Sequence, residues 1–132
     1  MDGDRLLLDT AFVQALLNRR DQYHGAAQAL LPRLKAAREV WVTEAVLLEV
    51  GNALSALNRT AAADFIAQCY RTANMRVVGV DAALLIRGVD LYRGRPDKTW
   101  SLTDCISFVV MDDEGLTLAA TADRHFVQAG FV

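Results

Sequence analysis

The chain has 132 residues, a length that predicts one domain, spanning residues 1–132, with a core of its own. Hydrophobic residues make up 53% of it, which argues against an intrinsically disordered chain, and no apolar run approaches the roughly 18 residues needed to span a bilayer. The formal net charge of −2 gives no overall basic field, so a nucleic-acid ligand would have to be held by local basic groups or by metal ions.

Two features of the sequence predict a cytoplasmic protein. The first nine residues, MDGDRLLLD, contain only three consecutive leucines and lack the pattern of a signal peptide. Both cysteines, Cys69 and Cys105, lie in apolar helical segments and are typical of reduced thiols in a protein core. We therefore expect neither disulfides nor membrane association.

Short apolar runs alternate with helical patterns along the chain. The runs that predict buried strands are 6–8, 40–42, 77–80 and 116–120, with a short edge strand expected at 131–132. The helical patterns cover 11–17, 44–57, 61–73, 82–92 and 102–113, with another helix after Asp21 that Pro32 kinks or breaks and a last one from about Asp123. Helix caps are expected at Thr10, Asp21, Thr43 and Asp81.

This alternation predicts a three-layer α/β/α sandwich with a central parallel sheet of four to five strands. In such sheets, ligands bind in the crevice at the carboxyl ends of the strands. Asp9 ends the first strand, and Asp123 follows closely after the last long one. Both carboxylates are therefore expected in the same crevice.

Two helices are expected to bring further acids to this place. Glu49 lies between one and two turns into the helix that follows the second strand, and helical side chains point back toward the N-terminus. Asp104 lies in the first turn of an apolar helix. The segment Ser101-Leu-Thr-Asp104 also matches a capping box, and capping alone could explain this acid.

Four carboxylates in one crevice repel one another, and a divalent cation would remove that conflict. Mg²⁺ and Mn²⁺ prefer oxygen ligands, and Mg²⁺ often binds through a few carboxylates together with substrate phosphate. The chemistry that suits such a site is metal-assisted hydrolysis of a phosphodiester bond.

The segments around these acids resemble those of a PIN domain, and most closely the small PIN ribonucleases typified by VapC-like toxins. They read Leu-Leu-Asp9-Thr10, Glu49-Val-Gly-Asn-Ala-Leu, Ser101-Leu-Thr-Asp104-Cys-Ile-Ser-Phe and Thr121-Ala-Asp123-Arg-His-Phe-Val-Gln-Ala-Gly-Phe. The resemblance implies an endoribonuclease with Mg²⁺ or Mn²⁺ held by Asp9, Glu49, Asp104 and Asp123. It also implies a supporting hydroxyl from Thr121, or less directly from Ser101 or Thr10. The expected partners are RNA, a second copy in a homodimer, and a small antitoxin whose C-terminal segment covers the crevice.

Basic residues near these acids are candidates for holding the substrate. Arg93, Arg95 and Lys98 lie in the loop before the Asp104 helix, and Arg124 follows Asp123. This loop is flanked by Tyr92 and Trp100, and basic groups beside aromatic rings are typical of single-stranded nucleic-acid sites. The alternative is a solvated loop with Trp100 packed in the core.

Other functions fit the sequence less well. A phosphoacceptor signalling domain needs an acidic pair after the first strand and a lysine near the fifth, but Asp9 is followed by Thr10-Ala11 and no lysine follows Lys98. An Asp-x-Asp phosphatase fails at Ala11, and no G-x-G-x-x-G segment marks a dinucleotide site. Neither His24 nor His125 has the partner pattern of a nucleophilic triad. The remaining alternative is a PIN-fold module that binds RNA or protein without cleaving.

Overall fold

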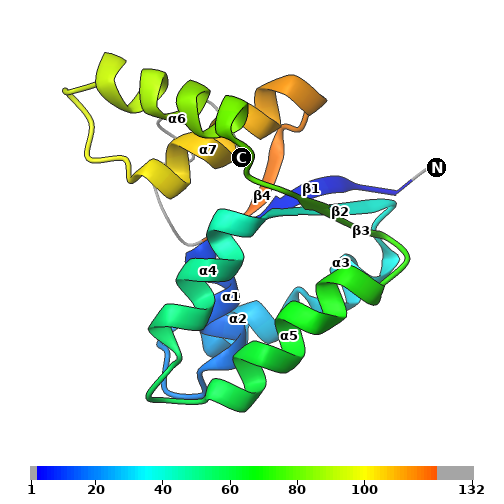
Figure 1. Ribbon diagram of the computed structural model, residues 1–132. Helices are drawn as coiled ribbons and strands as arrows, with labels where there is room; N and C mark the ends of the chain where they lie inside the picture. Colours follow the sequence, from blue (N-terminus) through cyan, green and yellow to red (C-terminus); the bar gives the residue numbers. More distant parts are fainter. Residues whose placement is uncertain (1–2, 122–132) are drawn as a thin grey trace.

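A four-stranded parallel sheet forms the centre of the computed structural model, which describes residues 3–121 (Figure 1). The strands are β1 (Arg5–Leu8), β2 (Glu39–Thr43), β3 (Met75–Val78) and β4 (Leu118–Ala120). Their order across the sheet is β3-β2-β1-β4, so the first strand of the chain is central and lies beside the last described one. The expected last helix and the edge strand at 131–132 lie outside the described residues.

Helices cover both faces of the sheet (Figure 1). One face packs against α1 (Thr10–Leu17), α2 (His24–Ala29), α3 (Leu31–Ala36), α4 (Glu44–Ala53) and α5 (Arg59–Arg71). The other is covered by α6 (Ala82–Gly94) and α7 (Leu102–Glu114). The predicted three-layer α/β/α architecture is therefore confirmed, with four parallel strands within residues 3–121.

The two cores follow from the alternation of side chains along the strands. Leu6 and Leu8 of β1 belong to the cluster beneath α1–α5, whereas Leu7 belongs to the cluster beneath α7. In the second cluster the Trp100 and Phe108 rings meet edge to face, with centroids 5.0 Å apart. A Cβ added at Gly88 of α6 would lie 2.7 Å from Ile106 Cγ1, so this glycine allows the close approach of α6 to α7.

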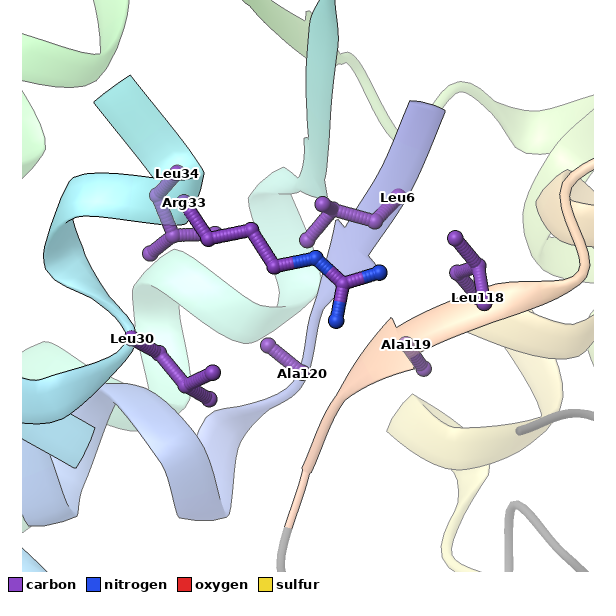
Figure 2. A pocket seen from close by; sticks show the side chains of 7 residues that line it. All are labelled: Leu6, Leu30, Arg33, Leu34, Leu118, Ala119 and Ala120. Carbon is purple, nitrogen blue, oxygen red and sulfur yellow. The ribbon is translucent and has the colours of Figure 1, made fainter. Parts of the chain in front are cut away.

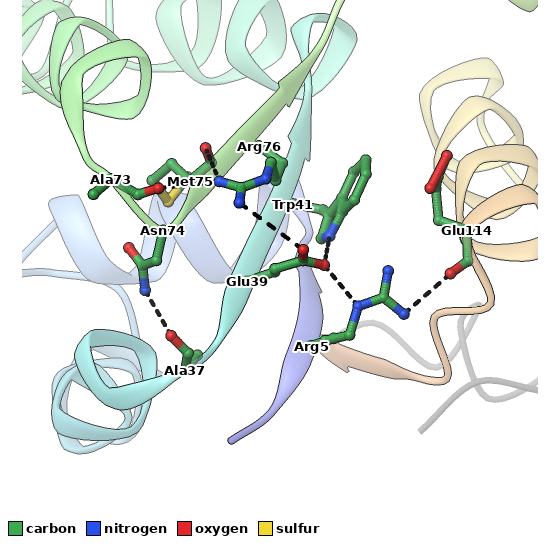
Figure 3. A network of polar contacts seen from close by, with 9 residues as sticks. All are labelled: Arg5, Ala37, Glu39, Trp41, Ala73, Asn74, Met75, Arg76 and Glu114. Atoms are coloured by element: carbon green, nitrogen blue, oxygen red, sulfur yellow. Dashed lines mark hydrogen bonds and ion pairs between the residues drawn. The ribbon is translucent and has the colours of Figure 1, made fainter. Parts of the chain in front are cut away.

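Charged side chains tie the strands together at the edge of the sheet where they begin (Figure 3). Arg5 Nε donates to Glu39 Oε1 at 2.6 Å, and Trp41 Nε1 donates to the same oxygen at 3.1 Å. Arg76 of β3 lies 3.9 Å from the other Glu39 oxygen. These contacts, above all the hydrogen bond from Arg5, lower the pKa of Glu39. Arg5, Glu39 and Arg76 are thus paired with one another at this edge. Asp9 lies at the opposite edge, after the end of β1.

A small apolar pocket of about 220 Å³ lies beside the edge strand β4 (Figure 2). Leu6, Leu30, Leu34 and Leu118 line it, and Arg33 extends across it. The Arg33 guanidinium is held by Asp4 at 2.6 Å. The ion pair with Asp4 therefore holds the one charged side chain among the described residues that line this pocket.

The predicted break near Pro32 is confirmed, because the helix after Asp21 is two short helices and Pro32 lies at the start of the second. Other predicted details were wrong. The Asp21 carboxylate accepts from the Tyr23 N–H instead of capping either helix. Helix α4 ends at Ala53, four residues before the predicted end, and Asn58 then caps α5. Strand β3 lies two residues earlier than predicted, because Val80 has left the sheet and donates its N–H to Glu44.

Candidate active site

Asp9 lies at the carboxyl edge of the sheet, between the end of β1 and the start of α1. Its side chain is only 2% exposed. Its backbone N–H donates to the Ala120 carbonyl at 3.1 Å, and one carboxylate oxygen accepts from Thr121 Oγ1 at 2.7 Å. The predicted supporting hydroxyl of Thr121 therefore contacts the predicted acid of the first strand, although the two residues are 112 positions apart.

Glu49 joins three helices through its two carboxylate oxygens. Thr10 Oγ1 of α1 donates to Oε1 at 2.8 Å, and Thr103 Oγ1 of α7 donates to Oε2 at 2.9 Å. Thr10 was expected to cap α1, but it is the first residue of that helix, and its hydroxyl binds Glu49 instead. Thr10 follows Asp9, and Thr103 precedes Asp104. The two bonds therefore bring Glu49 of α4 close to the starts of α1 and α7, where Asp9 and Asp104 lie.

Asp104 has the capping role that its sequence allowed. Its backbone N–H donates to Ser101 Oγ at 3.0 Å, and its own carboxylate accepts from the Ser101 N–H at 3.2 Å. The side chain is 7% exposed, so this carboxylate is buried among the polar groups at the start of α7. Capping therefore accounts for part of its surroundings and does not prevent a second role.

The donor chemistry of these acids fits a divalent cation such as Mg²⁺ or Mn²⁺, because each offers only carboxylate oxygens. Within residues 3–121, no three Asp, Glu, His or Cys side chains are grouped so that they could hold a metal ion by themselves. Asp123, the fourth predicted acid, lies outside that range. The described residues thus supply the type of ligand, and threonine hydroxyls fix the positions of two of the carboxylates.

Comparison with known families assigns the chain. The profile of the PIN domain matches residues 6–132, nearly the whole chain. The chain belongs to the PIN domain family. The predicted resemblance to a PIN domain is thereby confirmed.

Within the described residues, no helix is both long and apolar enough to cross a membrane.

Two solved structures are similar to this PIN domain. VapC20 from Mycobacterium tuberculosis, described as a sarcin-ricin loop cleaving toxin, is 29% identical over 96% of both chains, with a TM-score of 0.85. FitAcB from Neisseria gonorrhoeae is 16% identical over 95% of this chain and 92% of that one, with a TM-score of 0.60, and shows a likeness of fold alone. No curated protein matches the sequence.

The basic loop of this PIN domain lines a groove of about 770 Å³ that extends to Ser101 at the start of α7. Arg95 donates to both carboxylate oxygens of Asp97 at 3.0 Å and lies over the Trp100 ring, 5.0 Å from its centroid. Lys98 Nζ lies 3.8 Å from the same carboxylate, and the hydrogen bond from Arg95 lowers the pKa of Asp97. Trp100 is buried, as the alternative prediction had it. Two of the three predicted cations of this loop are thus partly neutralised by Asp97.

The remaining predicted substrate residues differ in their surroundings. Arg93 is exposed, lines the same groove and has no ion pair within residues 3–121. Arg124 lies outside those residues.

The His24 ring is hydrogen-bonded through Nδ1 to the Ala15 carbonyl at 2.8 Å, and this contact packs α2 against α1.

Glu44 and Thr103 have roles that sequence reasoning missed. The Glu44 carboxylate at the start of α4 accepts from Tyr70 Oη at 2.6 Å and from the Val80 N–H at 3.3 Å. The first of these bonds raises the pKa of Tyr70 to about 12. Thr103 could have been suspected from the sequence, because it directly precedes Asp104 in the first turn of α7. Thr10 has a similar place in the first turn of α1, directly after Asp9.

Proposed function

We propose that this PIN domain, formed by residues 1–132 as a single unit, is a metal-dependent endoribonuclease and the toxin of a toxin–antitoxin pair. The proposed ligands of Mg²⁺ or Mn²⁺ are Asp9, Glu49, Asp104 and Asp123. The substrate is RNA, held in part by Arg93, Arg95, Lys98 and Arg124. The alternative is a PIN domain that binds RNA or protein without cleaving it.

The observation that carries the proposal is the pair of hydrogen bonds on Glu49. Thr10 and Thr103 hold both of its carboxylate oxygens, and each threonine is the chain neighbour of another proposed ligand. These bonds hold the Glu49 carboxylate near the starts of the helices beside Asp9 and Asp104. This position at the carboxyl edge of the sheet, where ligands bind in folds of this kind, supports the proposal. The likeness to VapC20, a toxin that cleaves the sarcin-ricin loop, supports RNA as the substrate class.

The residues of the chain have distinct tasks in this mechanism. The carboxylates bind the cation, and the hydroxyls of Thr10, Thr103 and Thr121 orient two of them so that little reorganisation is needed when it binds. A bound divalent cation supplies a more acidic water as nucleophile and a positive charge that stabilises the departing oxygen. The groove at Arg93 holds the phosphate backbone beside the acids.

Cleavage of RNA by the purified protein, with and without Mn²⁺ or Mg²⁺, tests the proposal. Asp104→Asn should lower the rate by about 100-fold or more, which corresponds to about 2.7 kcal/mol. The amide oxygen of Asn can still accept the Ser101 N–H, so the start of α7 should stay intact. Asp112→Asn, at the exposed far end of the same helix, is the matched control and should cleave like the wild type. Metal-independent cleavage, or RNA binding without any cleavage, would contradict the proposal, and the second result would favour the binding module.

The toxin role is tested in cells. A nuclease that cleaves cellular RNA needs an inhibitor in the same compartment, so we infer a small antitoxin that covers the acids, and a homodimer as the toxin's own state. Expression of this chain alone should slow growth, and Asp9→Asn should relieve the effect at equal protein levels. Unimpaired growth with soluble wild-type protein would speak against the toxin role.

A further inference from the structure

Three arginines gather at the far ends of α1 and α4, away from the sheet. Arg19 and Arg20 follow Asn18, the C-cap of α1, and Arg59 begins α5. A hollow of about 370 Å³ lies there, lined among others by Asn18, Arg19, Arg20, Leu57 and Asn58. Arg19 and Arg20 line the hollow, and Arg59 is the chain neighbour of the lining residue Asn58. We call the surface made of Arg19, Arg20 and Arg59 the distal basic surface.

The charges of the distal basic surface are not neutralised by acids of the described chain. All three arginines are exposed, and none of them makes an ion pair within residues 3–121. Arg59 uses one donor on the Ser55 carbonyl at 3.3 Å, which leaves most of its guanidinium for other acceptors. By contrast, Arg95 in the loop before α7 is paired with Asp97 through two hydrogen bonds. The distal basic surface therefore offers more unpaired positive charge than that loop.

The ends of the helices do not account for this charge. The carbonyl ends of α1 and α4 and the amino end of α5 meet at this hollow, which Asn18, Leu54 and Asn58 line. Two carbonyl ends and one amino end leave a net partial charge of only about −0.5, which is too little to account for three cations. An arginine after a helix can stabilise that helix through its carbonyl end. Such a role explains one cation after α1, but not the second one, nor Arg59 at the amino end of α5, where a positive charge is unfavourable.

The position of the surface relates it to the acids. Helix α1 starts beside Asp9 and ends just before Arg19, and its eight residues correspond to a length of about 12 Å. Successive phosphates of one strand in a double helix are about 3.4 Å apart along the axis. A strand bound at the acids would therefore reach the distal basic surface after roughly three to four phosphates.

We propose that the distal basic surface binds backbone phosphates of a structured RNA, several nucleotides away from the bond that is cut. The choice of RNA over another polyanion rests on the proposed function. Arg19 and Arg20 supply planar donor groups that bind phosphate oxygens in pairs. This contact adds affinity for folded RNA and leaves the chemical step to the acids.

Binding of a fluorescently labelled RNA stem-loop in EDTA, over a series of salt concentrations, tests this inference without cleavage. The double variant Arg19→Ala/Arg20→Ala is compared with Arg38→Ala/Arg71→Ala. The control removes the same charge from two exposed arginines elsewhere that make no ion pair within the described part of the chain. Loss of two phosphate contacts should reduce the slope of log K against log salt by about 1.4–1.8. If the plots of log K against log salt for the wild type and the variant meet at 1 M salt, the variant binds about 25- to 60-fold more weakly than the wild type in 0.1 M salt. Arg19→Lys/Arg20→Lys should restore most of the slope.

The outcomes separate this inference from the proposed function. Cleavage of a short single-stranded RNA oligonucleotide in Mn²⁺ measures the proposed function. Arg19→Ala/Arg20→Ala should cleave it at the wild-type rate. Selective loss of stem-loop binding supports the inference even if no RNA is cleaved. The inference is overturned if Arg19→Ala/Arg20→Ala binds the stem-loop like the wild type, or if both double variants lose the same affinity. If stem-loop binding is unchanged, an acidic protein segment becomes the better ligand for this surface.

Discussion

Removing one threonine hydroxyl from Glu49 should weaken metal binding measurably. In Thr103→Val, Glu49 Oε2 loses the donor that now lies 2.9 Å away, while Thr10 still holds Oε1. A hydrogen bond to a charged acceptor contributes about 1.5–3 kcal/mol, and the partial exposure of Glu49 reduces this to about 1–1.5 kcal/mol. This corresponds to a roughly five- to tenfold higher Kd for Mn²⁺. Adding Thr10→Val removes the second donor, and the two losses should not add simply because they share one carboxylate.

Calorimetric titration with Mn²⁺ measures this effect, and the rise in melting temperature with Mn²⁺ gives an independent estimate. Thr72→Val is the matched control, because its hydroxyl donates to the Gln68 carbonyl at the end of α5, away from the acids. It should bind Mn²⁺ like the wild type. If Thr103→Val binds Mn²⁺ normally while Glu49→Gln does not, the threonines do not position Glu49. If neither variant changes the affinity, Glu49 is not a ligand.

Further predictions concern stability, thiol reactivity and the products. The hydrogen bonds from Arg87 lower the pKa of Asp113, so this pair stabilises the fold at neutral pH. Its contribution is lost as the pH falls through that lowered pKa. In urea unfolding, Arg87→Ala should therefore be less stable than the wild type at neutral pH, and this difference should fade below about pH 4. Burial raises the pKa of Cys69 to about 11, so iodoacetamide at pH 8 should label it only on unfolding, and rapid labelling seen by mass spectrometry would contradict its buried position. The cleaved RNA should carry 5′-phosphate and 3′-hydroxyl ends, and a 2′-deoxy nucleotide at the scissile position should weaken binding without preventing cleavage; cyclic-phosphate ends would refute this route.

The sequence was sufficient to predict the parts of the fold that depend on local pattern. Apolar runs located all four described strands, and the alternation with helices predicted the parallel three-layer arrangement. The positions of Asp9 and Asp104 relative to the element ends followed from the same pattern. The capping box at Ser101 was also predictable, because it depends on residues within one helical turn.

The rest depends on contacts between distant segments. Strand β3 stops early because Glu44 accepts the Val80 N–H, and no local pattern around 77–80 contains that information. The bond from Thr103 to Glu49 joins residues 54 positions apart, so its partner could not be named before the helices were placed. The neutralisation of Arg95 by Asp97 is local, but it requires a particular loop conformation that composition does not determine.

The pairing of β4 with β1 has a consequence for when the protein can become active. Asp9 leaves the ribosome 112 residues before Thr121, so its contacts with Ala120 and Thr121 can form only after those later residues have been made. At elongation rates of about 5–20 residues per second, the 112 positions between Asp9 and Thr121 take roughly 6–22 s to synthesise. During this time the helices α1 and α4 can form, but the candidate site lacks the strand that completes it. A chain whose synthesis has not reached β4, or one cut off before it, therefore lacks the contacts that Ala120 and Thr121 make with Asp9.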